Sequence, residues 1–480
     1  MPLLTETASP SEAALVRVLG VRQLTAAIVN TTVGAGIFVI PALVSQGLGA
    51  AAPLAFLLCA TIMALIATTL AMAGSRVALT GGIYAYVEVA FGPFLAFLAG
   101  VLQWLTFVLA VAGVATALLD QLAVLAPGVG SRAAHVVLLA LILATLARLN
   151  VRGVRFGTRL VEAVTVAKLV PLLVFVGVGA FFIDPASIAW PGLPGGDALG
   201  RSVLLLIFAY AGVEVALAPS GEVKNTARTV PRALFLALLI TTALYIAIQL
   251  VAQGVLGRAL SEQTGTPLAD AAGRFLGNAG VTLMLVGAIC SMFGYLCGDM
   301  LSSPRSLYAI ARDGFLPAVF ARIDPTYRTP AAAIWTHAAL VLVFASTNTF
   351  QSLAIIGNVG LLILYLLACA AALELARRDV RAGAPPFAPP GAWVGPVAGG
   401  ALVLWILSTA TLAEFAVTAI VLALAALAYA VRKRARLTVL CVSCAIGLPL
   451  TAAASPQDFD LEAVRASKRV GAEHDTHHPP

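Results

Sequence analysis

Charged residues are scarce in this chain of 480 residues. Asp, Glu, Lys and Arg together make up 11% of the sequence, whereas soluble domains carry about 25%. Apolar residues make up 60%, against about 45–50% in soluble domains. They fall in long blocks that short charged stretches separate, such as PLLVFVGVGAFF. These two departures exclude a water-soluble domain and indicate a polytopic membrane protein.

The chain also lacks the short motifs of several catalytic classes. It contains no Walker A loop, no H-E-x-x-H and no G-x-S-x-G. Their absence argues against an ATP-driven pump, a zinc protease and a serine hydrolase. We therefore expect no enzymatic activity, no cofactor and no metal centre. The end of the chain, EHDTHHPP, could hold a metal weakly, but a disordered tail is the favoured interpretation.

Cysteine is rare as well, with six residues, all in apolar segments. Cys441 and Cys444 form a C-x-x-C pair, but no second pair accompanies them. We therefore expect the cysteines to have packing roles rather than to bind metal or carry out redox chemistry.

Twelve apolar stretches are candidates to cross a bilayer, which takes roughly 20 residues. They cover 23–49, 53–74, 93–119, 133–150, 157–183, 201–219, 230–256, 278–304, 331–347, 352–375, 393–410 and 412–431. A further apolar stretch at 437–454 could be a short thirteenth span or an interfacial segment. The expected organisation is a cytoplasmic tail at 1–22, one membrane domain at 23–432 and a C-terminal segment at 433–480.

Basic residues set the expected orientation, because cytoplasmic loops of membrane proteins are enriched in Lys and Arg. With the N-terminus inside and twelve alternating spans, nineteen basic residues fall in inside loops. Four fall outside: Arg132, Arg201, Arg258 and Arg274. We expect a multi-pass protein of the inner (cytoplasmic) membrane, made without a cleavable signal peptide. The net charge of +7 is a topology signal, so we infer no nucleic-acid partner from it.

Two spans carry helix-breaking residues near mid-membrane. The first reads NTTVGAGIFVIPALV, with Gly34 and Gly36 followed by Pro41. The sixth reads LLLIFAYAGVEVALAPSGEV, with Gly212 followed by Pro219. Glycine weakens a helix by about 1 kcal/mol relative to alanine. A broken helix survives at membrane depth only where it lines a cavity within the protein.

The two breaks lie five spans apart, so the segments that carry them enter the membrane from opposite sides. Interrupted helices at matching places in two halves indicate an inverted repeat around a central binding site. Glycines that merely let helices pack closely are the alternative. The matching positions, and Glu214 beside the second break, favour the binding site.

Four motifs carry a family resemblance: GAGIF in the first span, FAYAGVE in the sixth, GEVKNTARTVPRAL after it and PRSLYAIARDGFLP after the eighth. In this order they resemble the amino acid–polyamine–organocation superfamily of amino acid transporters over nearly all of spans 1 to 10. The resemblance implies a leucine-transporter-like all-α fold of five-plus-five inverted repeats, about 23–183 and 201–375, with two trailing helices at about 393–431. It also implies alternating access to a central site. One departure is Thr226, where the family usually has proline.

An unwound helix offers partners for both charges of an amino acid. The amides after the first break suit a carboxylate, because a helix N-terminus is partly positive; they belong to Ala35, Gly36 and Ile37. The free carbonyls suit an ammonium group, and they lie near Thr32 and Val33 and, before Gly212, near Phe208, Ala209 and Ala211. The resemblance implies a carboxylate on Ala35 and Gly36, and an amine on the carbonyls of Thr32, Phe208 and Ala211.

The substrate side chain has fewer candidate partners. Phe208 matches a family position that often carries an aromatic gate over the substrate. Tyr210 could line the pocket or pack outward. No acidic residue is placed to pair with a cationic side chain, so we expect a neutral or aromatic amino acid.

Two ionisable residues lie in the spans, where such groups are usually functional. Lys168 lies eleven residues into the fifth span. It could bind and release a proton, and some proton-coupled members of the family carry a lysine here in place of a sodium ion. A structural tether and a side chain that snorkels to the cytoplasmic face are the alternatives. Glu214 either carries or senses protons, or it caps the loosened backbone of the sixth span.

Two cytoplasmic motifs hold candidate gate residues. They are Glu222 and Lys224 between the sixth and seventh spans, and Arg312 and Asp313 after the eighth. These residues either brace the inner gate through ion pairs or are solvated loop charges. Asp299 and Glu162 are interpreted as further ion-pair or gate partners. The isolated His135 and His337 are interpreted as packing residues or as partners in a single hydrogen bond.

The expected function is secondary active transport of amino acids, driven by protons and independent of sodium. An exchanger of amino acids or polyamines is the alternative within this class. A sensor that binds an amino acid without transporting it is the alternative from another class, and a long signalling domain would support it.

Overall fold

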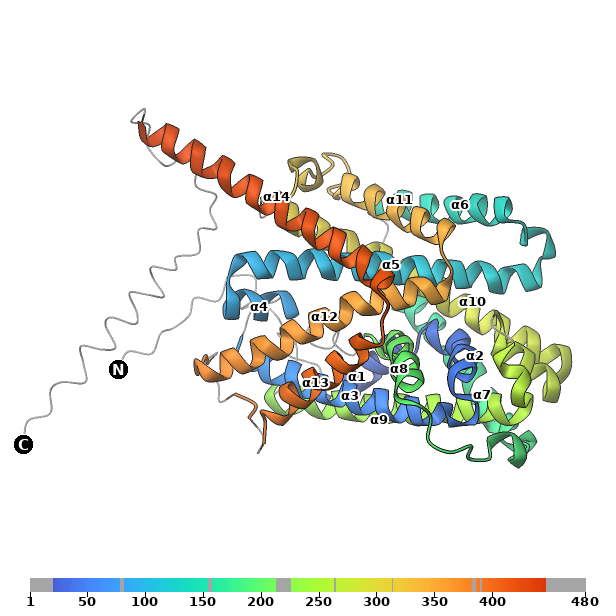
Figure 1. Ribbon diagram of the computed structural model, residues 1–480. Coiled ribbons are helices and arrows are strands. Elements are labelled where there is room, and N and C mark those ends of the chain that lie inside the picture. Colours follow the sequence, from blue (N-terminus) through green and yellow to red (C-terminus); the bar gives the residue numbers. More distant parts are fainter. Residues whose placement is uncertain are drawn as a thin grey trace, which may run out of the picture. The chain divides into compact units, whose positions relative to one another are not determined.

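Every element in the described part of the chain is helical (Figure 1). The computed structural model describes residues 20–77, 82–153, 158–212, 226–262, 265–312, 314–381, 386–388 and 391–445. The chain divides into two compact units after Ala425, and helices α1 to α13 lie within the first. The all-α fold expected from the apolar blocks is confirmed.

The predicted spans correspond closely to the observed helices. The longer helices are α1 (Val21–Thr32), α2 (Gly36–Leu48), α3 (Ala52–Gly74), α5 (Pro93–Leu125), α6 (Arg132–Val151), α7 (Thr158–Gly179), α8 (Gly196–Tyr210), α9 (Thr226–Leu256), α10 (Pro267–Arg312), α11 (Ala331–Thr347), α12 (Phe350–Arg377), α13 (Val394–Ser408) and α14 (Leu412–Ala445). Seven helical stretches are long and apolar enough to cross a membrane, and three shorter apolar helices accompany them. The count of twelve spans stays a prediction, because α1, α2 and α8 are half-helices that length alone does not mark as spans.

Three features differ from the sequence prediction. A short helix, α4 (Ile83–Phe91), precedes α5 between Gly82 and Gly92, both of which have positive φ. Helix α10 begins at Pro267 and kinks at Gly277, directly before the predicted span. Helix α14 continues through the basic residues at 432–436 as far as Ala445, so no break separates the twelfth span from the start of the 437–454 stretch. Residues 446–454 lie outside the described residues.

Contacts between helices in the first half of the chain have equivalents in the second half. The correspondence pairs α3 with α9, α5 with α10, α6 with α11 and α7 with α12, and it pairs the interrupted helix α1/α2 with α8. Contacts of α3 with α8 and of α9 with α1 then become equivalent, as do contacts of α12 with α5 and of α7 with α10. All four contacts are present, which is the pattern that an inverted repeat requires.

These contacts divide the helices into two groups. The bundle comprises α1, α2, α3, α8 and α9, and the scaffold comprises α5, α6, α10 and α11. Helix α7 packs on both α10 and α9, and α12 packs on both α5 and α3. Both interrupted helices therefore belong to the bundle, and α7 and α12 join the bundle to the scaffold.

Helices α7 and α10 approach each other closely at Gly287. A Cβ atom added to Gly287 would lie 2.7 Å from Cγ of Pro171 and 3.3 Å from the carbonyl oxygen of Ala167. Real carbon atoms do not come that close, so the contact requires glycine. It sets the distance between α10 and the segment of α7 that carries Lys168.

Replacing Gly287 with valine is expected to lower the stability of the protein by about 1–3 kcal/mol, because an added side chain must displace its packed neighbours. The melting temperature of the purified protein measures the change. Gly298→Val on the same helix is the matched control, since nothing lies within 4 Å of a Cβ atom added there. Equal melting temperatures for the two variants would contradict the close contact.

Candidate binding site

The first predicted break is present in the structure. Helix α1 ends at Thr32 and α2 begins at Gly36, so Val33 to Ala35 leave the helical path. Val33 and Ala35 are buried, and the ψ angle of Val33 is 86°. Among the described residues, the N–H groups of Ala35, Gly36 and Ile37 have no backbone acceptor. They form the unsatisfied first turn of α2.

The second break begins where the sequence predicts it. Helix α8 ends at Tyr210, Ala211 has a ψ angle of 145°, and Gly212 has a φ angle of +108°. Only glycine adopts such a φ angle readily. Residues 213–225 lie outside the described residues, and they include Glu214 and the gate candidates Glu222 and Lys224.

The two breaks lie against each other. A Cβ atom added to Gly36 would lie 3.2 Å from Cα of Ala209 and 3.2 Å from the ring of Phe208. A Cβ atom added to Gly212 would lie 3.2 Å from the side chain of Thr31. The start of α2 therefore contacts the end of α8, and the end of α1 contacts Gly212. The structure brings the two predicted halves of the site together.

Tyr245 of α9 joins the two breaks, and the sequence analysis missed it. Its hydroxyl lies 2.9 Å from the carbonyl oxygen of Thr32 and 3.0 Å from that of Ala209. The side chain is fully buried. A tyrosine hydroxyl has one proton and donates to one acceptor at a time, so it is shared between these two carbonyls. Thr32 and Ala209, both named as candidates from the sequence, thus have a protein donor already.

The two aromatic residues at the end of α8 take different environments. Phe208 is half-buried and meets Phe350 of α12 edge to face, with ring centroids 5.3 Å apart. Tyr210 is fully buried, lies edge-on to Tyr245, and its hydroxyl donates to the carbonyl of Phe56 at 3.3 Å. Tyr210 therefore packs inside the bundle, whereas Phe208 lies beside Gly36 at the junction of the breaks.

Lys168 is buried and its ammonium group donates to the carbonyl of Asn30, two residues before the end of α1. The side chain thus reaches from α7 to the first broken helix instead of snorkelling to the surface. No carboxylate within the described ranges forms an ion pair with Lys168. In the part of the chain that the structure describes, the ammonium group therefore binds a neutral carbonyl and no carboxylate.

Asp299 and His337 meet inside the scaffold. The sequence predicted a packing role or a single hydrogen bond for His337, but it did not identify Asp299 as the partner. Asp299 Oδ2 lies 3.3 Å from Nε2 of His337, and Asp299 Oδ1 accepts from the hydroxyl of Ser303 at 2.6 Å. The ring of His337 faces Trp104 of α5. Two residues 38 positions apart on α10 and α11 thus form a buried polar pair away from the breaks.

The remaining predicted site residues are only partly described. Arg312 is the last residue of α10, and Asp313 lies outside the described residues. Glu162 falls on α7, in a stretch whose side chains are not described. Within the described ranges, no three His, Cys, Asp or Glu residues gather in a metal-binding arrangement.

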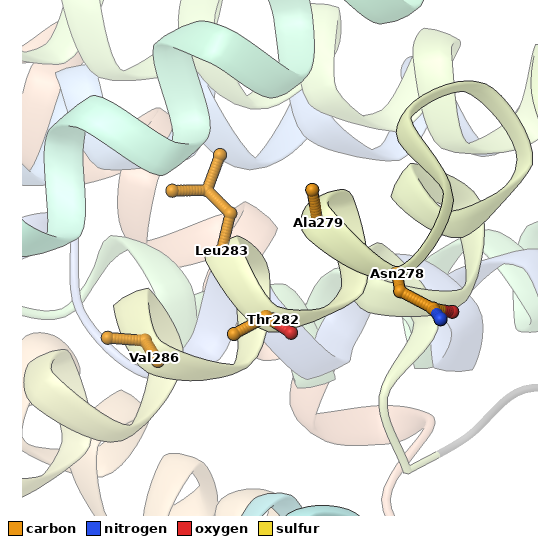
Figure 2. A pocket seen from close by; sticks show the side chains of 5 residues that line it. All are labelled: Asn278, Ala279, Thr282, Leu283 and Val286. Atoms are coloured by element: carbon orange, nitrogen blue, oxygen red, sulfur yellow. The ribbon is translucent and has the colours of Figure 1, made fainter.

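A surface hollow on α10 does not belong to this site. Its lining is shown in Figure 2 and consists of Asn278, Ala279, Thr282, Leu283 and Val286. All five residues come from one helix and none is charged. The hollow therefore offers no pair of opposite charges for a zwitterion.

Comparison with known proteins agrees with the motifs. A family model described as amino acid permease matches residues 19–423. The methylthioribose transporter of Bacillus subtilis is 29% identical over 427 residues, which cover 85% of this chain and 91% of the relative. The serine/threonine exchanger SteT of the same organism is 30% identical over 371 residues, covering 75% of this chain and 84% of the relative.

A third relative is the branched-chain amino acid permease BcaP of B. subtilis, 23% identical over 393 residues, which cover 78% of this chain and 83% of the relative. The family model spans both breaks and all helices from α1 to α13. This chain is therefore a multi-pass membrane protein that belongs to the amino acid permease family of the amino acid–polyamine–organocation superfamily.

Proposed function

We propose that this permease moves an amino acid across the cytoplasmic membrane by alternating access, coupled to protons and independent of sodium. The observation that carries the proposal is the meeting of two interrupted helices, where Gly36 faces Ala209. Their free N–H groups and carbonyls provide partners of opposite sign within one site. The relatives named as a serine/threonine exchanger and a branched-chain amino acid permease support an amino acid as the solute.

The first turn of α2 suits the substrate carboxylate. The N–H groups of Ala35, Gly36 and Ile37 lie at the positive end of the helix dipole, which favours an anion. Gly36 has no side chain between this turn and α8, so Ala209 and Phe208 pack directly against it. A carboxylate that leaves water needs several such donors, and this turn supplies them without any charged side chain.

The ends of α1 and α8 suit the substrate ammonium group. The proposed acceptors are the carbonyls of Val33, Phe208 and Ala211, together with those of Thr32 and Ala209. The last two share the hydroxyl of Tyr245, yet each carbonyl oxygen has two lone pairs and keeps one for an ammonium group. Tyr245 would then orient these carbonyls before the substrate arrives.

Phe208 is proposed as the aromatic gate over the substrate. It stands at the junction of the breaks and is held edge-on by Phe350 of α12, which contacts the scaffold. Neither residue carries a charge. In the described part of the site, no acidic residue is placed to pair with a cationic side chain of a substrate. These features favour a neutral or aromatic amino acid.

Lys168 is proposed as the proton-coupling group or the stand-in for a sodium ion. Its ammonium binds the carbonyl of Asn30 on α1, close to the substrate half-site at Thr32 and Val33. In either role, the positive charge of the protonated amine at this place would repel Na⁺, which supports sodium independence. Glu214 follows Gly212 by two positions in the sequence. It is proposed as a second proton-linked group or as a cap for the backbone of the sixth span.

The proposed orientation has the N-terminus in the cytoplasm, and a group of contacts at the inner face supports a gate there. Arg76, after α3, donates to the carbonyl of Val380 at 3.2 Å and lies 3.6 Å from Asp379, after α12. A hydrogen bond from Arg381 holds the pKa of Asp379 below its usual range, so this contact stays ionised at the pH of a transport assay. Glu222, Lys224, Arg312 and Asp313 are proposed to brace the same gate.

Two other functions remain as rivals. The relative named as an exchanger supports obligate exchange of amino acids as the runner-up mechanism. The relative named as a methylthioribose transporter makes that sugar derivative a rival substrate. Methylthioribose has hydroxyl groups but no carboxylate and no ammonium group, so it would not match the two partial charges of opposite sign in the site.

Uptake into sodium-free proteoliposomes tests the proposed function. With an acid-outside pH gradient, a labelled neutral amino acid is expected to accumulate, and without the gradient it is expected only to equilibrate. Labelled methylthioribose in parallel vesicles is the control for substrate class. Uptake that requires amino acid preloaded inside would establish exchange, and uptake of methylthioribose alone would overturn the amino acid proposal.

Lys168→Ala is expected to reduce gradient-driven uptake by on the order of tenfold or more, the equivalent of one charged hydrogen bond of about 1.5–3 kcal/mol. Lys168→Arg separates the two roles of the lysine, because arginine keeps the charge but does not release its proton. If the lysine carries protons, gradient-driven uptake fails in both variants. Normal gradient-driven uptake by the arginine variant would reduce Lys168 to a structural cation.

Tyr245→Phe is expected to lower the free energy of unfolding by about 1–3 kcal/mol, because it leaves a buried carbonyl without its donor. It is also expected to weaken substrate affinity severalfold, since the carbonyls of Thr32 and Ala209 lose their fixed orientation. Melting temperatures and substrate titrations measure both effects. Tyr210→Phe is the control, because its longer hydrogen bond ends on Phe56, outside the site. Normal affinity in Tyr245→Phe would remove Tyr245 from the proposed site.

A further inference from the structure

Two arginines at the end of α6 have no acidic partner among the described residues. Arg148 and Arg152 lie one helical turn apart and are exposed, and no residue of the described ranges forms an ion pair with either. Together with Val151, Tyr327 and Trp335 they line a small hollow between α6 and α11. The hollow is well away from the helix breaks. Its lining combines two positive charges with two aromatic rings.

The walls of this hollow are held in place by hydrogen bonds. The hydroxyl of Thr329 donates to the carbonyl of Val151 at 2.7 Å, which ties the turn before α11 to the end of α6. Within that turn, Asp324 Oδ1 accepts from the backbone N–H groups of Thr326 and Tyr327, both at 2.9 Å. The one acid of the turn is therefore engaged by the backbone beside it. The hollow is a built feature of the surface rather than a gap between loose loops.

The two arginines also continue an apolar face of α6. Val137 and Leu141 are each 59% exposed. Leu141 precedes Arg148 by seven residues, or about two helical turns, so both apolar residues lie on the same face as the arginines. On α11, Val343 and Trp335 are similarly exposed and eight residues apart, also on one face. Helices α6 and α11 pack together. Two exposed apolar faces therefore lead to one hollow with two positive charges.

The dimensions fit one leaflet of a bilayer. Leu141 and Arg152 are eleven residues apart, which is roughly 16 Å along a helix. Half of the hydrocarbon core measures about 15 Å. Tyrosine and tryptophan favour the boundary between hydrocarbon and headgroups. With the acyl chains along Leu141 and Val137, the guanidinium groups would lie at the depth of the phosphates.

We propose that this hollow binds the headgroup of an anionic phospholipid, with Arg148 and Arg152 on its phosphate and its acyl chains along the exposed faces of α6 and α11. Arginine suits this role because its planar guanidinium group binds two phosphate oxygens at once. Trp335 and Tyr327 flank the headgroup at the membrane boundary. The site is independent of the proposed transport mechanism, because it uses no residue of the breaks.

Native mass spectrometry of the purified, delipidated full chain tests the proposal. The protein is titrated with phosphatidylglycerol and with phosphatidylcholine of the same acyl chains. We expect one phosphatidylglycerol to bind preferentially. In the double variant Arg148→Gln/Arg152→Gln, this binding is expected to weaken about 30-fold, or about fivefold for each arginine. Equal binding of both lipids by the unmodified protein would overturn the proposal.

Two variants and one competitor serve as controls. Arg132→Gln/Arg258→Gln removes two exposed arginines elsewhere and is expected to leave phosphatidylglycerol binding unchanged. Arg148→Lys/Arg152→Lys keeps the charge and is expected to bind within a few-fold of the unmodified protein. A loss in the lysine variant as large as in the glutamine variant, with a lowered melting temperature, would indicate structural damage and overturn the assignment. The same loss with an unchanged melting temperature would support it, because lysine cannot make the two-oxygen contact of arginine. Binding of inorganic phosphate alone at the same arginines, with no gain from acyl chains, would assign the site to a free anion instead.

Discussion

Backbone hydrogen bonding inside the membrane is the constraint on which this structure depends. An unpaired N–H or carbonyl group in hydrocarbon costs several kcal/mol, so a helix cannot stop at mid-membrane unless protein surrounds the ends. Here two helices stop, at Thr32 and at Tyr210, and each end contacts the other broken helix. Tyr245 supplies one hydroxyl to a carbonyl of each. The polar groups that this arrangement leaves at the start of α2 are the chemical basis of the proposed site.

The last turn of α1 is held from two sides. Tyr245 of the bundle binds the carbonyl of Thr32, and Lys168 of α7 binds the carbonyl of Asn30. Helix α7 in turn packs on the scaffold through the close contact at Gly287. The end of α1 therefore accepts hydrogen bonds both from the bundle and from α7, the helix that joins the bundle to the scaffold. It lies next to the proposed ammonium subsite.

The sequence predicted the local features of the site and missed the contacts between distant residues. Gly34, Gly36 and Gly212 marked both breaks, because glycine in an apolar span is a local signal. Tyr245 lies in LYIAIQL, where nothing distinguishes it from a tyrosine that faces lipid. Asp299 and His337 were each visible, but their pairing depends on how α10 packs against α11. The continuation of α14 was missed because a run of Lys and Arg resembles a topology signal, although both residues form helices well.

The bond between Lys168 and Asn30 has a thermodynamic consequence for any change in shape. The lysine sits on α7, which packs on the scaffold, and its acceptor sits on α1, which belongs to the bundle. A rearrangement that separates α1 from α7 must break this bond, and the bond exists in full strength only when the amine carries its proton. Protonation of the amine therefore favours the arrangement in which α1 and α7 stay in contact. By thermodynamic linkage, that arrangement favours protonation by the same factor. If Lys168 is the proton-coupling group proposed above, this one contact would link the protonation of the amine to the position of α1 relative to α7.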